Sequence, residues 1–262
     1  MSAIIVDDDV VHYEVLGRGR PVIFVHGWLG SWRYWIPTMQ TLSSDYRTYA
    51  LDLWGFGDSG KRSERYHLDA QAELLRGFMD RLAILKAAFV GHGLGGAVVA
   101  HFARRFPELA DRAMAVGVPL TRQALTERLL DTALASLIET AIGRGPQLEP
   151  ISREAGKTDQ AAVATSVRAL MSADLKDTVA ELKLPYLLVY GEKDAIVTPP
   201  SDGLMEFLTN NVHSIELEDS RHFPMLDEAA KFNRLVVDFL SLKSGEELTQ
   251  LALKDEWQRR VR

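Results

Sequence analysis

The stretch AAFVGHGLGG, residues 87–96, decides the fold of this chain. Its first half is a short apolar run, as expected for a parallel strand that helices cover on both faces. Its second half places glycines at positions 91, 93, 95 and 96, directly before a helical pattern over residues 95–106. Glycine allows tight turns and close backbone contacts. The stretch therefore predicts a strand, a glycine turn and a helix in immediate succession.

The same alternation of short apolar runs and helical patterns extends outward from this stretch in both directions. It is the pattern of parallel strands joined by crossover helices. We therefore expect an α/β fold with a mostly parallel central sheet and helices on both faces. Strands are predicted at residues 10–16, 22–26, 46–52, 88–91, 113–118, 186–190 and 214–217, and helices at residues 34–42, 69–85, 95–106, 201–209 and 224–240.

Residues 120–182 interrupt the alternation, because their pattern is helical throughout. A first helix carries an apolar stripe from Leu125 to Ala141, a polar loop is expected around GPQLEPISREAGK, and further helix is expected from residue 161. We predict a helical cap over residues 120–182, inserted into one core domain made of residues 1–119 and 183–262. The insertion contains no Phe, Tyr or Trp, so it would give a site beneath it an aliphatic roof.

Composition excludes several classes of protein. The 262 residues carry a formal net charge of −6, which disfavours nucleic acid and other polyanionic partners. The absence of cysteine removes disulfides, thiolate nucleophiles and cysteine metal sites. No apolar run is long enough for a membrane span, and the acidic N-terminus is unlike a signal peptide, so we expect a cytoplasmic protein without stable membrane insertion. The tail, residues 245–262, is expected to form a surface helix.

Residues suited to chemistry follow the predicted strands, at the edge where an open α/β sheet gathers its functional groups. His26-Gly27-Trp28 follows one strand, and a glycine-rich turn containing Trp54 follows another. Asp194 and His222 follow two later strands. The sequence thus predicts one site at the carboxyl edge of the sheet.

These motifs resemble the α/β-hydrolase family, in particular its small cofactor-free serine esterases and perhydrolases, over nearly the whole chain. In that family the turn reads G-x-S-x-G and carries the serine nucleophile. Here the corresponding residues 91–95 read GHGLG, so Gly93 stands in the nucleophile position. The family's chain order of nucleophile, acid and histidine is kept by Gly93, Asp194 and His222.

The resemblance implies a role for each remaining group. His222 would be the general base, and Asp194 would orient its ring. The backbone N–H groups of Trp28 and Leu94 would form the oxyanion hole. Trp28, Leu94 and Trp54 would contact a small apolar acyl or ester ligand. No cofactor or metal is expected, since the scattered histidines lack the spacing of a metal site.

Other residues near these turns have structural interpretations. His26 and His92 are expected to hydrogen-bond the loops around them, and Asp52 and Asp58 to brace the turn that contains Trp54. The aromatic residues near the two pocket-side loops divide evenly between core packing and a substrate wall; they are Trp32, Tyr34, Trp35, Trp54 and Phe56.

Gly93 leaves three interpretations open. The first is a carboxylic-ester hydrolase whose serine has been replaced, naturally or by engineering, so that the chain is inactive or very weak. The second is a ligand-binding or regulatory homologue without catalysis. The third is a non-hydrolytic enzyme that uses His222, or a water held by it, as a base. An aspartate nucleophile is excluded, because position 93 is not Asp. In every case we expect Gly93 to have a positive φ.

Overall fold

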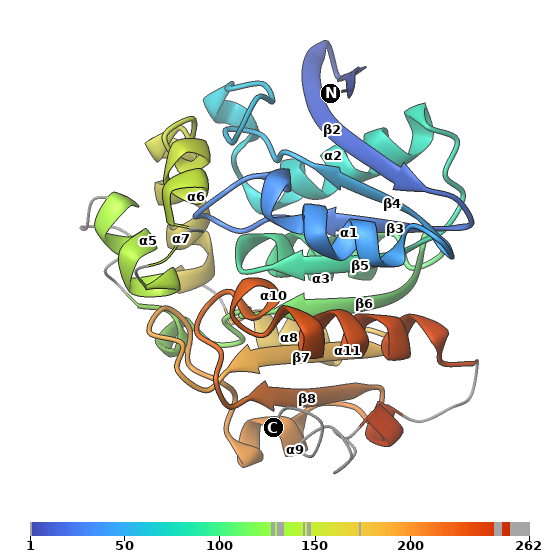
Figure 1. The fold of residues 1–262 in the computed structure, drawn as a ribbon, viewed down its shortest axis with the longest axis vertical. Helices are drawn as coiled ribbons and strands as arrows, with labels where there is room; N and C mark the ends of the chain where they lie inside the picture. The colour runs from blue at the N-terminus through green and yellow to red at the C-terminus, as the bar shows by residue number, and fades with distance from the viewer. Residues whose placement is uncertain are drawn as a thin grey trace.

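An eight-stranded sheet runs through the centre of the computed structural model (Figure 1). The structure describes residues 2–126, 129, 134–143, 145, 148–172, 174–243 and 248–251. The strands lie in the order β1-β2-β4-β3-β5-β6-β7-β8. Their bounds are β1 Ser2–Val6, β2 Asp9–Gly17, β3 Arg20–Val25, β4 Tyr46–Leu51, β5 Ala87–His92, β6 Ala110–Val116, β7 Tyr186–Gly191 and β8 Val212–Leu217.

The sheet is parallel from β4 to β8, and β1 and β2 add an antiparallel edge. The predicted α/β class with a mostly parallel sheet is confirmed. All seven predicted strands exist with small differences at their ends, but β1 was not predicted. Its side chains alternate between exposed and partly buried at the edge of the sheet, so it lacks the continuous apolar run of the central strands.

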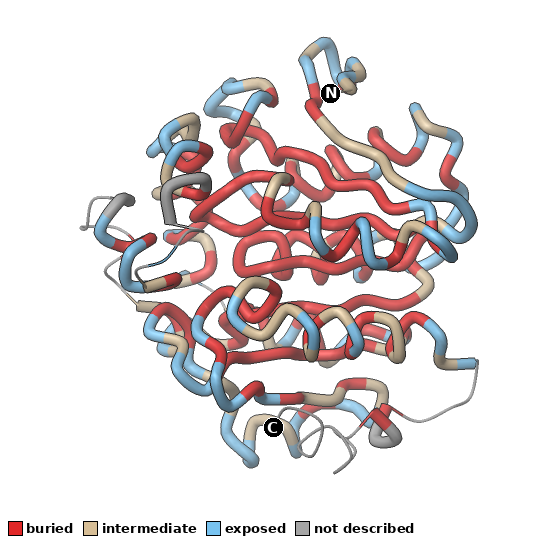
Figure 2. The backbone as a smooth tube through the Cα atoms, viewed as in Figure 1, coloured by how far each residue is buried: buried red, intermediate tan, exposed pale blue. Residues whose placement is uncertain are grey.

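Helices cover both faces of the sheet (Figure 1). On one face, α1 (Ile36–Leu42) contacts α11 (Ala229–Ser241), which follows the short α10 (Pro224–Asp227). On the other face, α3 (Leu94–Arg105) contacts α2 (Leu68–Arg81) and α8 (Leu175–Ala180). Figure 2 shows the consequence: the central strands are buried almost throughout, while exposed backbone lies on the outer helices and loops. Another helix of the core, α9 (Asp202–Phe207), precedes β8.

The predicted insertion contains α5 (Leu134–Ile142), α6 (Leu148–Ala155), α7 (Gln160–Ser172) and α8. The first three lie beyond the carboxyl ends of the strands (Figure 1). Two expectations were wrong. The segment expected as a polar loop contains α6, which buries Ile151 and Ala155 one turn apart. Leu125, expected in a helix, follows the short η3 helix (Arg122–Ala124) and pairs with Val197 in an isolated bridge. The domain boundaries themselves stay a prediction.

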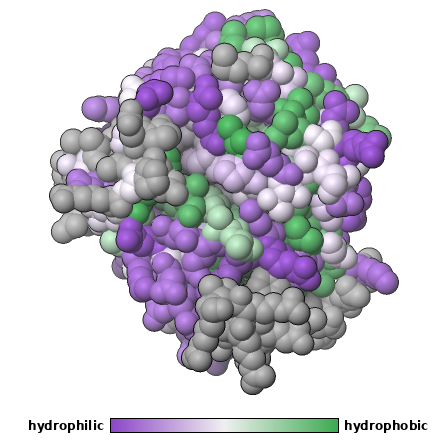
Figure 3. Space-filling view, in the orientation of Figure 1, coloured by the Kyte–Doolittle hydropathy of each residue, from purple (hydrophilic) through white to green (hydrophobic). Residues whose placement is uncertain are grey.

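The sequence also predicted that the chain has no membrane span and that its tail is helical. Among the described residues, no helix combines the length and apolar character needed to cross a bilayer. On the face in Figure 3, hydrophobic residues form small groups among hydrophilic ones. In the tail, a short helix, η4 (Leu248–Leu251), is described, and the rest of the predicted tail helix, residues 245–247 and 252–262, lies outside the described residues.

Candidate active site

Gly93 lies in the turn between β5 and α3, where its backbone has φ 50° and ψ −114°. The predicted positive φ is therefore present, and it is a conformation that glycine adopts without the penalty of a side chain. The turn is held by a hydrogen bond from the Gly93 N–H to the Val116 carbonyl, with an N···O distance of 2.8 Å. A Cβ atom at Gly95 would lie 2.3 Å from the Val25 carbonyl oxygen. Glycine is thus required where α3 crosses β3.

His222 and Asp194 form a buried hydrogen-bonded pair on the loops that follow β8 and β7. His222 Nδ1 lies 2.8 Å from Asp194 Oδ2, and both side chains are at most 1% exposed. The other carboxylate oxygen, Oδ1, accepts backbone N–H groups from Ile196 at 2.7 Å and Val197 at 3.2 Å. Because a carboxylate accepts hydrogen bonds, Nδ1 of His222 carries the proton, and Nε2 is left as the basic nitrogen.

Gly117, directly after β6, makes room for this pair. Its φ is +54°, and a Cβ atom there would lie 3.2 Å from the His222 ring and 3.5 Å from Asp194 Oδ2. A side chain at this position would press on both partners. Glycine at position 117 therefore leaves the space that the Asp194–His222 pair occupies.

The His222 ring faces the turn at Gly93. A Cβ atom added at Gly93 would lie 3.6 Å from His222 Nε2, within reach of a one-atom extension such as a hydroxyl. The same Cβ atom would lie 3.1 Å from Cζ3 of Trp28, whose indole is fully buried against the glycine. The structure thus brings together Gly93, Asp194, His222 and Trp28 as the sequence predicted; their catalytic roles stay predictions.

Two backbone N–H groups belong to residues that adjoin Gly93, since Leu94 follows it in the chain and the Trp28 indole packs against it. Leu94 is the first residue of α3, so its N–H has no acceptor within the helix. Within the part of the chain that the structure describes, the Trp28 N–H also has no hydrogen-bond acceptor. Both residues are fully buried. These are the donors that the sequence predicted for an oxyanion hole.

Residues of the predicted cap contact the loops around this site. The Trp28 Nε1–H donates to Ser166 Oγ of α7 at 3.0 Å. The N–H of Asp159 donates to the Gly55 carbonyl at 2.8 Å. Glu154 of α6 pairs with Arg33 at 3.1 Å. These contacts join the cap segment to the loops that follow β3 and β4.

Asp52 organises the turn after β4. It is fully buried, and its carboxylate accepts the N–H groups of Trp32 and Asp58, each at 3.0 Å. His26 joins the same region, because its Nε2 accepts the Leu53 N–H at 3.0 Å. His12, Asp52 and Asp58 place ligand-type atoms within 4.8 Å of one another. Each Asp52 oxygen accepts a backbone N–H group, so Asp52 braces the loop, as expected.

The aromatic residues whose role was left open are all buried: Trp32, Tyr34, Trp35, Trp54 and Phe56. Trp54 exchanges two backbone hydrogen bonds with the Gln71 side chain, and the Arg65 guanidinium lies 5.2 Å from its ring centroid. Packing accounts for these contacts, and contact of Trp54 with a ligand stays a prediction.

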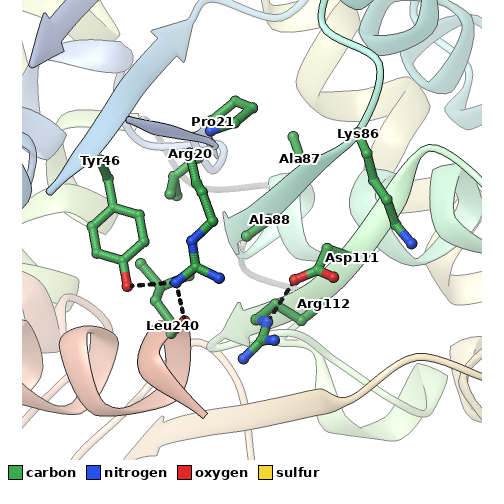
Figure 4. Close-up of a pocket in the computed structure, with 10 residues that line it drawn as sticks. Arg20, Pro21, Tyr46, Lys86, Ala87, Ala88, Asp111, Arg112 and Leu240 are labelled. Atoms are coloured by element: carbon green, nitrogen blue, oxygen red, sulfur yellow. Dashed lines mark hydrogen bonds and ion pairs between the residues drawn. The ribbon is translucent and has the colours of Figure 1, made fainter. Parts of the chain in front are cut away.

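A cavity of about 210 Å³ lies at the opposite edge of the sheet, at the amino ends of β3, β5 and β6 (Figure 4). Both arginines that line it, Arg20 and Arg112, make hydrogen bonds within the fold. Arg20 donates to Tyr46 and to the Leu240 carbonyl near the end of α11, and Arg112 pairs with Asp111. This cavity is therefore separate from the site at Gly93.

Two buried histidines, His26 and His92, should make the stability of the protein depend on pH. Burial lowers the pKa of His26, and burial followed by the charge of His222 holds the pKa of His92 well below its usual value. The unfolded chain thus binds protons below about pH 6.5 that the folded chain resists, so the free energy of unfolding should fall as pH drops below that value. Urea unfolding between pH 5 and 7 measures this dependence.

His92→Gln isolates the contribution of His92. In this variant the free energy of unfolding should change less steeply with pH than in the wild type, by at most about 1.4 kcal/mol per pH unit. Parallel profiles for the two proteins would mean that His92 is protonated equally in both states.

Sequence reasoning missed two residues that the structure brings to the site, Gly117 and Ser166. Gly117 was placed inside the predicted strand over residues 113–118, whereas β6 ends at Val116, so its position directly after the strand was not recognised. Ser166 lies among small and apolar residues of a helix, and nothing in that pattern marks it as the partner of Trp28.

Comparisons with known proteins agree with this fold. A family model described as alpha/beta hydrolase fold matches residues 20–141. A pimeloyl-[acyl-carrier protein] methyl ester esterase of Aliivibrio fischeri is 25% identical over 88% of this chain and 97% of its own length. The enzyme of the same name from Aeromonas salmonicida is 27% identical over 88% of this chain and 99% of its own length.

Solved structures show the same fold. The enol-lactonase from Burkholderia xenovorans superposes with a TM-score of 0.80, at 22% identity, over 92% of this chain and 100% of the other. The meta-cleavage product hydrolase from Pseudomonas fluorescens superposes with a TM-score of 0.81, at 23% identity, over 92% of this chain and 97% of the other. With its parallel sheet and its strand–glycine–helix turn, the chain has the α/β-hydrolase fold.

Proposed function

We propose that the chain is a carboxylic-ester hydrolase of the Ser-His-Asp type in which Gly93 occupies the nucleophile position, so that it is inactive or very weak as it stands. The observation that carries the proposal is the His222 ring, held by Asp194 with Nε2 directed at Gly93. The curated relatives named as methyl ester esterases support the substrate class.

The retained groups suit the chemistry of ester hydrolysis. His222 Nε2 can take a proton from a nucleophile that attacks the ester carbonyl, while Asp194 stabilises the imidazolium. The oxyanion of the tetrahedral intermediate would accept the N–H groups of Trp28 and Leu94. On collapse of the intermediate, the ester C–O bond breaks, and the leaving alkoxide takes the proton from His222.

Water is the nucleophile available to the glycine form. Its oxygen would attack the carbonyl carbon as His222 removes its proton, which yields the acid and the alcohol. Loss of a serine nucleophile costs on the order of 10⁶ in turnover, although the oxyanion hole and substrate binding retain roughly 10³–10⁴ over water. The wild type should therefore hydrolyse esters slowly, through His222.

A second candidate is ligand binding without hydrolysis. The observation that favours it is the fit between Gly93 and Trp28, whose buried indole contacts the turn where a serine side chain would stand. In this case the site would retain an acyl ligand and leave it unchanged.

An anionic tetrahedral analogue separates the two candidates. The probe is methyl butylphosphonate, compared with neutral methyl butyrate, and binding is followed by tryptophan fluorescence because Trp28 lies in the site. If the oxyanion donors are intact, the phosphonate should bind the wild type at least about 100-fold more tightly, as transition-state analogues do. His222→Ala is the control for residual hydrolysis of nitrophenyl butyrate. Equal affinities, with hydrolysis unaffected by His222→Ala, would favour simple ligand binding.

A further inference from the structure

Two aromatic side chains connect the loop before Trp28 to the loop that carries His222. The Gly27 N–H lies 2.7 Å from the hydroxyl oxygen of Tyr34. The same hydroxyl lies 3.0 Å from Nδ1 of His92. On the other side of its ring, Nε2 of His92 lies 2.8 Å from the backbone carbonyl oxygen of His222. Both side chains are buried, His92 completely.

The direction of each hydrogen bond follows from the chemistry of the groups. A carbonyl oxygen only accepts, so His92 Nε2 carries the proton and donates to His222. In the neutral ring Nδ1 is then an acceptor, and it receives the Tyr34 O–H. The Tyr34 oxygen accepts the Gly27 N–H in turn. Burial supports these protonation states, because it lowers the pKa of His92 and raises that of Tyr34.

The packing leaves little freedom for either ring. Tyr34 meets His92 edge to face, with centroids 5.6 Å apart, and the His92 and His222 rings are 4.5 Å apart. A Cβ atom at Gly27 would lie 3.0 Å from His92 Nδ1, so the glycine permits this approach. The chain of hydrogen bonds therefore has one set of partners and one direction.

We propose that Tyr34 and His92 are positioning residues that hold the Trp28 backbone N–H and the His222 ring in one fixed relation across the turn at Gly93. The inference rests on the proposed function, since it concerns the groups that would stabilise the oxyanion and accept the proton. Gly27 immediately precedes Trp28, and the His222 carbonyl belongs to the base itself. The bridge formed by Tyr34 and His92 thus fixes the positions of both groups, although their loops are far apart in the sequence.

The structural part of the proposal is tested in the wild type, without any hydrolysis. In protein with ¹⁵N-labelled histidine, NMR should show His92 as the neutral Nε2–H tautomer at pH 7. Tyr34→Phe keeps the ring but removes the hydroxyl, so the Nδ1 resonance of His92 should shift while the Nε2–H remains. An Nδ1–H tautomer, or a His92 resonance that Tyr34→Phe leaves unchanged, would overturn the bridge.

The functional part is tested in the Gly93→Ser background. A displacement of about 1 Å in a reacting group can cost roughly 100-fold in rate, so Tyr34→Phe should lower kcat by about 10- to 100-fold with little change in KM. Tyr190→Phe is the matched control, because it also removes a buried, hydrogen-bonded tyrosine hydroxyl, one that donates to the Val118 carbonyl at 2.8 Å. It should leave kcat within about twofold. Equal losses in the two variants would assign Tyr34 a purely structural role.

Substitutions of His92 test the two hydrogen bonds of the bridge separately. His92→Gln can keep a donor for the His222 carbonyl, whereas His92→Leu removes both hydrogen bonds at similar volume. We expect Gln to retain more of kcat than Leu, and the reverse order would contradict the proposal. If Gly93→Ser itself shows no hydrolysis, the proposed function fails, while the tautomer and its response to Tyr34→Phe still decide whether the bridge exists.

Discussion

Gly93→Ser should raise the rate of nitrophenyl ester hydrolysis by at least about 10³-fold over the wild type, because it restores the nucleophile to an otherwise complete set of groups. The Cβ atom would lie 3.6 Å from His222 Nε2, which leaves the hydroxyl within hydrogen-bond reach of the base. Steady-state kinetics with nitrophenyl butyrate measures the gain.

The substitution also has two structural costs. A serine at φ 50° is strained by about 1–3 kcal/mol. Its Cβ atom also lies 3.1 Å from the Trp28 indole, which must move by a few tenths of an ångström. Adding His222→Ala to the serine variant is the control. Activity that survives this addition would show that the serine acts without the proposed base.

Gly95→Ala should destabilise the protein by about 3 kcal/mol or more, since the added methyl group would overlap backbone rather than side chains. Its Cβ atom would lie 2.3 Å from the Val25 carbonyl oxygen and 2.6 Å from that of His26. Neither atom can move without separating α3 from β3. Urea unfolding gives the change in free energy.

Gly203→Ala is the matched control for this substitution. Gly203 lies in α9 with nothing within 4 Å of its Cβ position, so the same exchange should stabilise the helix by about 0.5–1 kcal/mol. Similar changes in both variants would mean that the close approach at Gly95 does not limit stability.

The architecture could be predicted from the sequence because its signals are local. Apolar runs mark the central strands, and the glycines of residues 91–96 mark the strand-to-helix turn. The pairing of Asp194 with His222 was expected from the chain order shared with the resembling family. Two other elements were harder: the sequence of β1, SAIIV, shows no alternation of apolar and polar residues, and α6 in the insertion is so polar that its buried residues, Ile151 and Ala155, did not indicate a helix.

Contacts between distant residues could not be predicted in this way. His92 was expected to hydrogen-bond nearby loops, yet its partners, Tyr34 and the His222 carbonyl, are brought to it only by the folded sheet. The same holds for Ser166, which reaches Trp28 from the insertion. Such contacts depend on tertiary packing, and no periodicity in the sequence encodes them.

The central claim is that the site lacks only its nucleophile, and covalent labelling of Gly93→Ser tests it most directly. A fluorophosphonate reacts with a serine that a histidine activates, and mass spectrometry of the digested protein locates the adduct. The account predicts one adduct at position 93, which is absent from the wild type and lost when His222→Ala is added. An unlabelled serine variant that is correctly folded would contradict the account and leave ligand binding as the function of the site.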